Sequence, residues 1–289
     1  MKKVWLGRMI VSALVLCLLL PSPQPVQAIG PRDATTLAYS LSGAALAIAG
    51  GYLMWVNRPG NQDKMSWEVR GPGGFFVGGF MGASFVQNAS WTPLKGNYDP
   101  IATLPYNVNT SSISFTPGMV GGLKFGYFCH RFPYLGMELD GSYTTNRIGN
   151  QTVTFSPPVL NRTRAIIPQE DYATLNLAFH FLARYGFLKD KEVPFGRLQP
   201  YVGVGPNLAI LWGDVDAAKN FGLDVVGGVR YMLLKYLSVF VEYKYSRQWE
   251  VELGHSKIRP LNTGQEFRGA AVFDWSTHKV VTGLTFHFW

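Results

Sequence analysis

Three residues near the C-terminus have the side-chain types of a hydrolytic triad. His255, Ser256 and Glu266 lie in or near the segment LGHSKIRPLNTGQEF, where they could serve as base, nucleophile and orienting group. His255 and Ser256 are adjacent, however, and adjacent side chains point to opposite faces of an extended chain. The alternative is a polar loop exposed to solvent, as loops normally are. We favour the polar loop and keep the three residues as candidates for catalysis.

A second group of ionisable residues recurs at strand spacing and suits charge pairing. We predict that these residues share one face of several strands: Lys124, Glu138, Asp140, His180, Arg184, Asp224, Arg230, Glu242 and Lys244. His180 is interpreted as a partner in this network, because no second His or Cys shares its register, as a metal site would need. We therefore expect no metal and no cofactor.

The elements that position these residues show a period of two. In YLSVFVEYKYSRQW, which starts at Tyr236, apolar side chains alternate with mostly polar ones, as in a half-buried strand. Similar runs bring the predicted number of strands to eight. The other seven lie at about Gly74–Gln87, Gly118–Cys129, Tyr134–Thr145, Ala173–Ala183, Pro200–Trp212, Gly222–Met232 and Thr277–Phe288.

The connections between these strands alternate in length. HRFP, RYGFLKDKEVPFGRLQ and LLK are turns or modest links, whereas most of the others are long, with about thirty residues after the first strand and nearly as many after the third and seventh. Short turns on one side and long loops on the other are typical of an up-and-down antiparallel barrel that crosses a membrane. The fold predicted for 73–289 is therefore an all-β, eight-stranded transmembrane barrel.

The charged face decides which side of the barrel meets lipid. Four acids and four bases in the core of a soluble sandwich would carry a very large desolvation cost. Inside a transmembrane barrel they can pair with one another, and eight strands leave an interior just wide enough for side chains to fill. We predict a plugged, charge-paired lumen.

The barrel segments resemble the OmpA-like family of eight-stranded outer-membrane barrels, without the peptidoglycan-binding domain. The resemblance covers roughly 73–289 and rests on GFFVGGFMGASF, YLGMELDGSY, LQPYVGVGPNLA, GGVRYMLLKYLSVFVEYKYS and GLTFHF. It implies a bacterial outer-membrane location, and a terminal aromatic residue that the barrel-assembly machinery reads. Phe286 and Phe288 form an outward row with Leu284, and Trp289 overhangs by one residue, so either Phe288 or Trp289 could be the aromatic that is read.

The N-terminal 28 residues have the layout of a cleaved secretory signal peptide: a basic start, an apolar run and a small residue at Ala28. Without Lys2, Lys3 and Arg8, the chain has 23 basic and 18 acidic residues, a net charge of +5 that is too diffuse for nucleic acid. Residues 29–72 are predicted to hold an apolar helix, at about 34–56, and a linker. We leave open whether this helix spans a membrane, lies on its surface or packs in the periplasm.

Three function classes follow from these patterns. The favoured one is a non-enzymatic, monomeric outer-membrane barrel that supports envelope integrity or presents long surface loops for binding or adhesion. The alternatives are a lipid A-modifying acyl hydrolase built on His255, Ser256 and Glu266, and a small-solute channel. The expected partners are outer-membrane lipids and lipopolysaccharide, whose phosphates Arg147, Arg162 and Arg164 could contact from the second long loop. A solvated basic loop is an equal alternative for these arginines.

Overall fold

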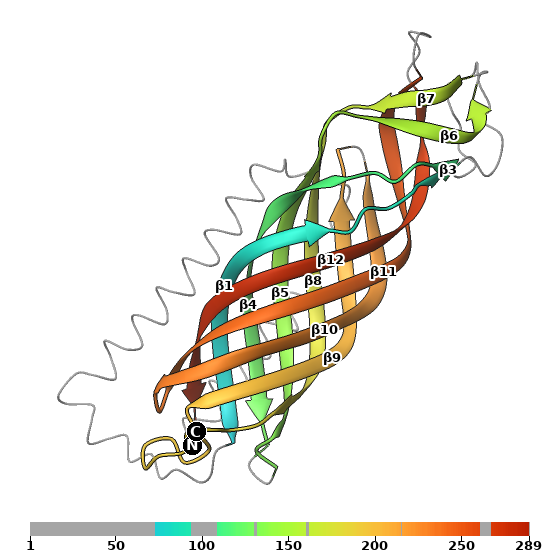
Figure 1. Ribbon diagram of the computed structural model, residues 1–289. Helices are drawn as coiled ribbons and strands as arrows, with labels where there is room; N and C mark the ends of the chain where they lie inside the picture. The colour runs from blue at the N-terminus through green and yellow to red at the C-terminus, as the bar shows by residue number, and fades with distance from the viewer. Residues whose placement is uncertain are drawn as a thin grey trace.

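The computed structural model of the chain describes residues 73–93, 109–129, 132–159, 162–214, 216–260 and 267–288. These residues form an all-β structure whose long strands join into a closed ring (Figure 1). The predicted signal peptide at 1–28 and the predicted helix and linker at 29–72 lie outside them. Among the described residues, no helix is long and apolar enough to cross a membrane.

Eight long strands make the ring, as the alternation in the sequence predicts. In ring order they are β1 (Gly74–Val86), β4 (Phe115–Phe128), β5 (Leu135–Ile148), β8 (Glu170–Arg184), β9 (Leu198–Trp212), β10 (Ala217–Leu234), β11 (Leu237–Pro260) and β12 (Phe267–Phe288). Each strand pairs antiparallel with the next, and β12 pairs with both β11 and β1. The predicted eight-stranded antiparallel ring is confirmed.

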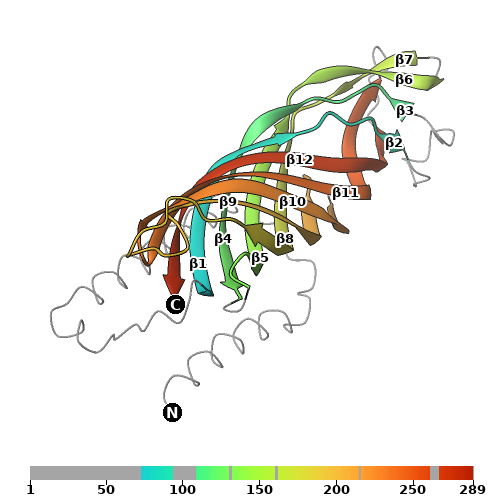
Figure 2. The same cartoon turned by 60° about the horizontal axis from the view of Figure 1, so that its bottom comes forward.

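The first and last strands close the ring along an unbroken register. Phe75 pairs with Phe288 at one end and Val86 with Thr277 at the other, and Figure 2 shows the C-terminal end of β12 beside the start of β1. A Cβ atom on Gly82 would lie 2.0 Å from the carbonyl oxygen of Val280. The seam therefore requires glycine at this position, because the backbones approach too closely for a side chain.

The two ends of the barrel differ. At the end that holds Gly74 and Phe288, here called the terminal end, the chain turns through 129–134, 185–197 and 235–236. The opposite end, here called the loop end, carries four further strands, of which Figure 1 labels β3, β6 and β7. These are β2 (Thr92–Pro93), β3 (Asn109–Thr110), β6 (Gln151–Val159) and β7 (Arg162–Ile167). The predicted separation of short turns from long excursions is therefore present.

Two of the predicted long loops are wrong. β11 and β12 continue past the predicted strand ends and leave only 261–266 between them. The segment between β5 and β8 forms a hairpin of β6 and β7, in which Gln151 pairs with Ile167. Extended structure continues here because alternate residues such as Val153, Phe155 and Ala165 bury apolar side chains. The gain from that burial favours strands where length alone suggested a loop.

An apolar cluster closes the loop end from within. It combines inward residues of the ring with residues of the added hairpin: Val86, Trp91, Ile113, Ile148, Val153, Phe155, Ala165, Ile167, Tyr172, Leu211, Ala218, Val251, Leu253, Ala271, Phe273 and Trp275. Phe115 packs edge-on against Trp275, with ring centroids 5.3 Å apart. This cluster, here called the apolar plug, is the main hydrophobic core of the described chain.

The outer face of the ring is apolar and open. Large hydrophobic side chains are more than one third exposed on every ring strand, among them Phe75, Met81, Phe125, Met137, Phe181, Val202, Val229, Val241 and Val280. Water-soluble monomers rarely expose continuous apolar areas of this extent. The inverted arrangement, with apolar residues outside and charges inside, suits a barrel surrounded by lipid.

Candidate functional site

The barrel interior below the apolar plug holds a buried cluster of charged side chains. All nine ionisable residues predicted for the interior are at most 4% exposed. They lie there because each occupies a strand position whose side chain points inward. In β5, the buried Glu138 and Asp140 alternate with the exposed Met137 and Leu139. Closure of the ring therefore brings together side chains that are far apart in the sequence.

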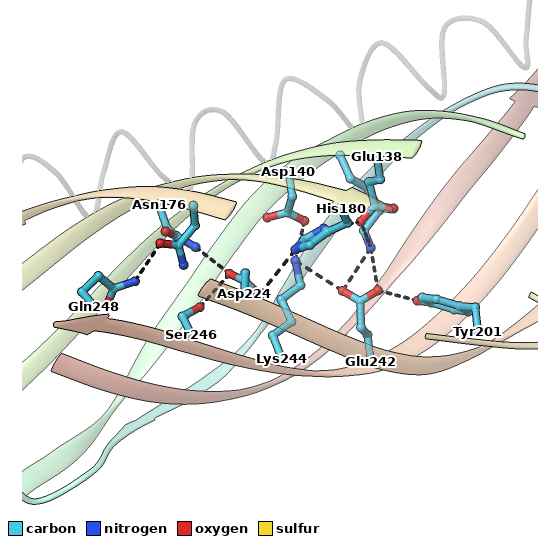
Figure 3. Close-up of polar contacts among 12 residues, drawn as sticks. Glu138, Asp140, Asn176, His180, Tyr201, Asp224, Glu242, Lys244, Ser246 and Gln248 are labelled. Carbon is cyan, nitrogen blue, oxygen red and sulfur yellow. Dashed lines mark hydrogen bonds and ion pairs between the residues drawn. The ribbon is translucent and has the colours of Figure 1, made fainter. Parts of the chain in front are cut away.

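Lys124, Glu242 and Lys244 form the centre of the cluster. Lys124 Nζ lies 2.8 Å from Glu242 Oε2 and 3.3 Å from Glu138 Oε1. Lys244 Nζ donates to Asp140 and lies 3.3 Å from Glu242 Oε1. Tyr201 donates its hydroxyl hydrogen to Glu242 at 2.5 Å. Figure 3 shows Lys244 and Glu242 pointing from one wall toward Glu138 and Asp140 on the other.

His180 links two acids of the cluster. Its Nδ1 lies 3.4 Å from Glu138 and its Nε2 lies 3.4 Å from Asp224. Neither ring nitrogen makes a hydrogen bond with the described residues, so His180 meets the two acids at ion-pair distance only. Asp224 also accepts from Asn176 at 2.9 Å and from Ser246 at 2.7 Å. The network therefore extends from the charged centre toward the amide and hydroxyl groups below the plug.

Aromatic rings complete the lining. Lys124 Nζ lies 4.4 Å from the ring centroid of Phe240, and Lys244 Nζ lies 4.2 Å from that of Phe80. Ring faces attract cations, an effect worth about 2 kcal/mol or more where water is excluded. Each lysine is thus held by carboxylates on some sides and by a ring face on another.

Two further residues, which were not predicted from the sequence, point into the interior because side chains alternate along each strand. Lys279 is 2% exposed and His287 is 3% exposed, both on the inward row of β12. His287 shares a hydrogen bond of 2.8 Å with Ser238 through its Nε2 atom. The outward assignment of Leu284, Phe286 and Phe288 already implies that the odd-numbered positions of β12 face inward. That signal could have identified both residues.

The triad candidates do not form a site among the described atoms. His255 and Ser256 belong to β11, where His255 is in register with Gly269 of β12. The prediction of a polar loop there is wrong, since the segment is extended and paired as far as Pro260. Glu266 lies outside the described residues.

The three arginines considered for lipid phosphates have different surroundings. Arg147, at the loop end of β5, pairs with Asp171 through Nε and Nη2 and remains partly exposed. Arg164 is exposed on β7, and Arg162 starts the same strand. The predicted loop around them is a hairpin, so β7 and not a loop carries Arg162 and Arg164.

The terminal aromatic residues line the closing seam. Thr285 and His287 face the interior, so Phe286 and Phe288 lie on the outer side of β12. Phe288 is in register with Phe75, whose ring stacks on that of Phe125 at 5.8 Å. Phe286 is only 8% exposed, although it shares its side with open neighbours such as Val77. Trp289 lies outside the described residues.

The link between β8 and β9, residues 185–197, is stabilised by hydrogen bonds and ion pairs among its own residues. Asp190 accepts from the amides of Val193 and Glu192 at 2.6 and 2.9 Å, and it pairs with Arg197. The Val193 amide, followed by Arg197, lowers the pKa of Asp190 below its ordinary value. Phe195 of this link stacks on Arg184, with the guanidinium carbon 4.4 Å from the ring centroid. The link thus packs against the interior at this end.

Metal chemistry has no visible support in the described part of the chain. No group of three or more His, Cys, Asp or Glu side chains is arranged there to hold a metal ion. Cys129 is a free, partly buried thiol. What the interior offers at its centre is a set of paired charges that link facing wall strands.

These features define a class: a closed eight-stranded antiparallel barrel with a charged interior and an apolar exterior. No protein-family model matches the chain, and no curated protein matches it. The solved outer membrane protein OprG from Pseudomonas aeruginosa is similar over 76% of this chain and 99% of its own, at 17% identity and a TM-score of 0.46.

Two further solved structures are similar over 74% of this chain. Neisserial surface protein A has 14% identity, 97% coverage of its own chain and a TM-score of 0.40. Ail, the attachment invasion locus protein of Yersinia pestis, has 11% identity, 99% coverage of its own chain and a TM-score of 0.29. Because these similarities are low, the function of this chain is argued below from its own residues.

Proposed function

We propose that this protein is a non-enzymatic outer-membrane β-barrel with a closed interior, which supports envelope integrity or binds surface ligands at its loop end. The observation that carries the proposal is the inverted pattern of the ring. Lys124, Glu138 and Glu242 are paired inside at 1% exposure each, while Val202 and Val241 outside are 62% and 57% exposed. Lipid is the solvent that stabilises such a surface.

Closure is supported at two levels of the interior. In the middle, side chains from facing walls meet in ion pairs and hydrogen bonds, with Lys124 bridging Glu138 and Glu242. At the loop end, the apolar plug fills the ring with aromatic side chains such as Trp275 and Phe273. An eight-stranded barrel has room for side chains and little more. These contacts favour a closed barrel over the alternative of a small-solute channel.

The enzymatic alternative lacks a supporting contact. An acyl hydrolase needs its nucleophile and base within hydrogen-bond reach of each other. His255 and Ser256 are consecutive residues of β11, and Glu266 lies outside the described residues, so no such contact is described. The non-enzymatic interpretation is therefore proposed, with outer-membrane lipid, lipopolysaccharide and the barrel-assembly machinery as partners and a monomer as the expected state.

The loop end is the proposed contact surface for the exterior. The hairpin of β6 and β7 extends beyond the ring there and exposes Arg164. Such a paired hairpin can present side chains to lipid phosphates or to another surface at a lower ordering cost than an unpaired loop. Signal cleavage near Ala28 and insertion with the short turns in the periplasm would place this end outside the cell.

Fractionation and heat modifiability test the proposal together. The expected result is a mature chain that begins near residue 29, fractionates with the outer membrane and migrates faster in detergent gels before boiling than after it. In planar bilayers the same folded material should show no steady conductance. Recovery in the soluble periplasm would contradict the membrane assignment, and a stable open channel would contradict closure.

A further inference from the structure

Two arginines and a histidine gather inside the barrel near its terminal end. The Arg230 guanidinium carbon lies 4.8 Å from the ring centroid of Phe76 and 5.6 Å from that of Phe128. Arg184 lies 3.5 Å from the same Phe128 ring, and the His287 ring is 6.0 Å from that of Phe76. All three basic side chains are at most 4% exposed. They surround one aromatic pair that is itself stacked at 5.2 Å.

The two arginines differ in their protein partners. Arg184 donates from Nε to the carbonyl oxygen of Pro133 at 2.8 Å and from Nη1 to Gln199 at 3.0 Å. Arg230 is 1% exposed, and its Nε and Nη2 are buried without a hydrogen-bond acceptor among the described residues. Within the same residues, no carboxylate lies within ion-pair distance of Arg230. Its cross-strand neighbour Gln199 already accepts from Arg184.

The two unmatched donors of Arg230 lie on one edge of the guanidinium. Nε and Nη2 point the same way and form the fork that binds two oxygens of one carboxylate or phosphate. The same chain uses this fork elsewhere. Arg147 directs Nε and Nη2 at the two oxygens of Asp171, and Arg197 directs them at Asp190 and Glu192. In Arg230 the chain supplies no oxygen pair for it among the described residues.

The charges of the interior show where an anion is needed. Below the apolar plug, five buried cations (Lys124, Arg184, Arg230, Lys244 and Lys279) face four buried acids (Glu138, Asp140, Asp224 and Glu242) among the described residues. The acids all pair within the central cluster, with Lys124, Lys244 and His180. Arg230 and Lys279 make no ion pair with these acids, so part of the excess positive charge falls on Arg230 at the terminal end. An uncompensated buried charge costs several kcal/mol, so a bound anion would stabilise this place.

We propose that this arginine cluster is a binding site for a small free oxyanion, with inorganic phosphate as the type ligand. Two oxygens accept from Nε and Nη2 of Arg230, and Arg184 adds positive charge from β8. The burial of both arginine side chains favours a small free ion over a phosphate attached to a lipid. The inference concerns a ligand inside the barrel and goes beyond the proposed function.

Titration of the folded protein tests the site directly. The barrel is refolded in a maltoside detergent, which carries no phosphate, and inorganic phosphate is added at constant ionic strength. The Arg230 Nε–H resonance, identified by its loss in Arg230→Lys, should shift in a saturable way with a stoichiometry near one. The unfolding midpoint should rise with phosphate, as it does for any ligand that binds only the folded state.

Matched variants separate the site from a general effect of salt. Arg230→Lys keeps the charge and removes the fork, so phosphate affinity should fall roughly 10-fold to 100-fold. Lys279→Gln removes a buried cation outside the site and should leave the phosphate response in place. Where a variant does not fold, the wild-type resonance titration still decides the question.

The proposal is overturned if neither phosphate nor sulfate shifts the Arg230 Nε–H resonance, since buried water would then be the partner of the fork. It is also overturned if Arg230→Lys binds phosphate as tightly as the wild type does. A shift produced only by an anionic phospholipid, and not by inorganic phosphate, would assign the contact to a headgroup and reject the free ion.

Discussion

Lys124 Nζ lies 2.8 Å from Glu242 Oε2, although 118 residues separate the two in the chain. Lys124 projects from β4 and Glu242 from β11, strands that are brought together only by closure of the ring. The pair therefore depends on closure of the barrel.

Glu242→Gln should destabilise the barrel strongly. It leaves Lys124 and Lys244 buried with one carboxylate fewer, and breaking a buried ion pair typically costs about 3–5 kcal/mol. Reversible urea unfolding of the refolded protein in detergent measures the change. The control is Arg147→Gln, which removes a partly exposed pair with Asp171 and should cost far less, because exposed ion pairs contribute little to stability. Equal losses from the two variants would contradict a dominant role for the central cluster.

Trp275→Ala should open a cavity in the apolar plug. Trp275 is 1% exposed and packs against Phe115, Tyr172 and Phe273, and truncation of a buried tryptophan costs about 3–5 kcal/mol. The matched control is Trp249→Ala, because Trp249 is 47% exposed. Thermal loss of the heat-modifiable form provides the measurement. A larger effect from Trp249 would mean that contact with the surroundings, and not the plug, stabilises the loop end.

Gly205→Ala and Gly227→Ala should have opposite consequences. A Cβ atom at Gly205 would lie 1.7 Å from the carbonyl oxygen of Phe179, whereas one at Gly227 would meet nothing within 4 Å. The first change forces a backbone shift that costs on the order of 1–3 kcal/mol. The second should stay within about 0.5 kcal/mol of the wild type. The measurement is the unfolding midpoint of each refolded variant. Similar midpoints for the two variants would argue against close packing of β8 on β9.

Acid should loosen the link at the terminal end through Asp190. Its pKa is lowered in the folded state by the Val193 amide and by Arg197, so its contribution is present above the ordinary pKa of an aspartate. That contribution is lost as the pH falls through the lowered value, which places the change below about pH 4. Hydrogen exchange at the Val193 amide should show reduced protection in that window. Asp190→Ala should show the reduced protection at neutral pH already, and unchanged protection would contradict the capping role.

Deletion of Phe288 and Trp289 should prevent assembly, on the expectation that the machinery reads a terminal aromatic residue. It also removes the register partner of Phe75 at the closing seam. The expected outcome is loss of the heat-modifiable form, with degraded or periplasmic material in its place. His255→Ala serves as the control and should assemble normally with lipid A unaltered. A mass change in lipid A that depends on His255 would favour the hydrolase alternative.

The sequence by itself determined the number of ring strands, the ring order and the side of each ring strand that faces inward. These follow from the two-residue period and from the alternation of short and long connections, which are local properties of the chain. The same alternation predicts that the side chains of Glu138, Asp140, Glu242 and Lys244 point inward. Lys279 and His287 were readable by the same rule and were missed.

Tertiary structure alone decided which interior charges meet and what closes the loop end. The pairing of Lys124 with Glu242 depends on the stagger of all eight strands around the ring, and a local pattern carries no information about that stagger. The β6 and β7 hairpin formed because burying Val153, Phe155 and Ile167 in the plug outweighed the freedom of a long loop. Whether Arg230 finds an acceptor is likewise a property of the closed interior, since each neighbouring acceptor belongs to another strand.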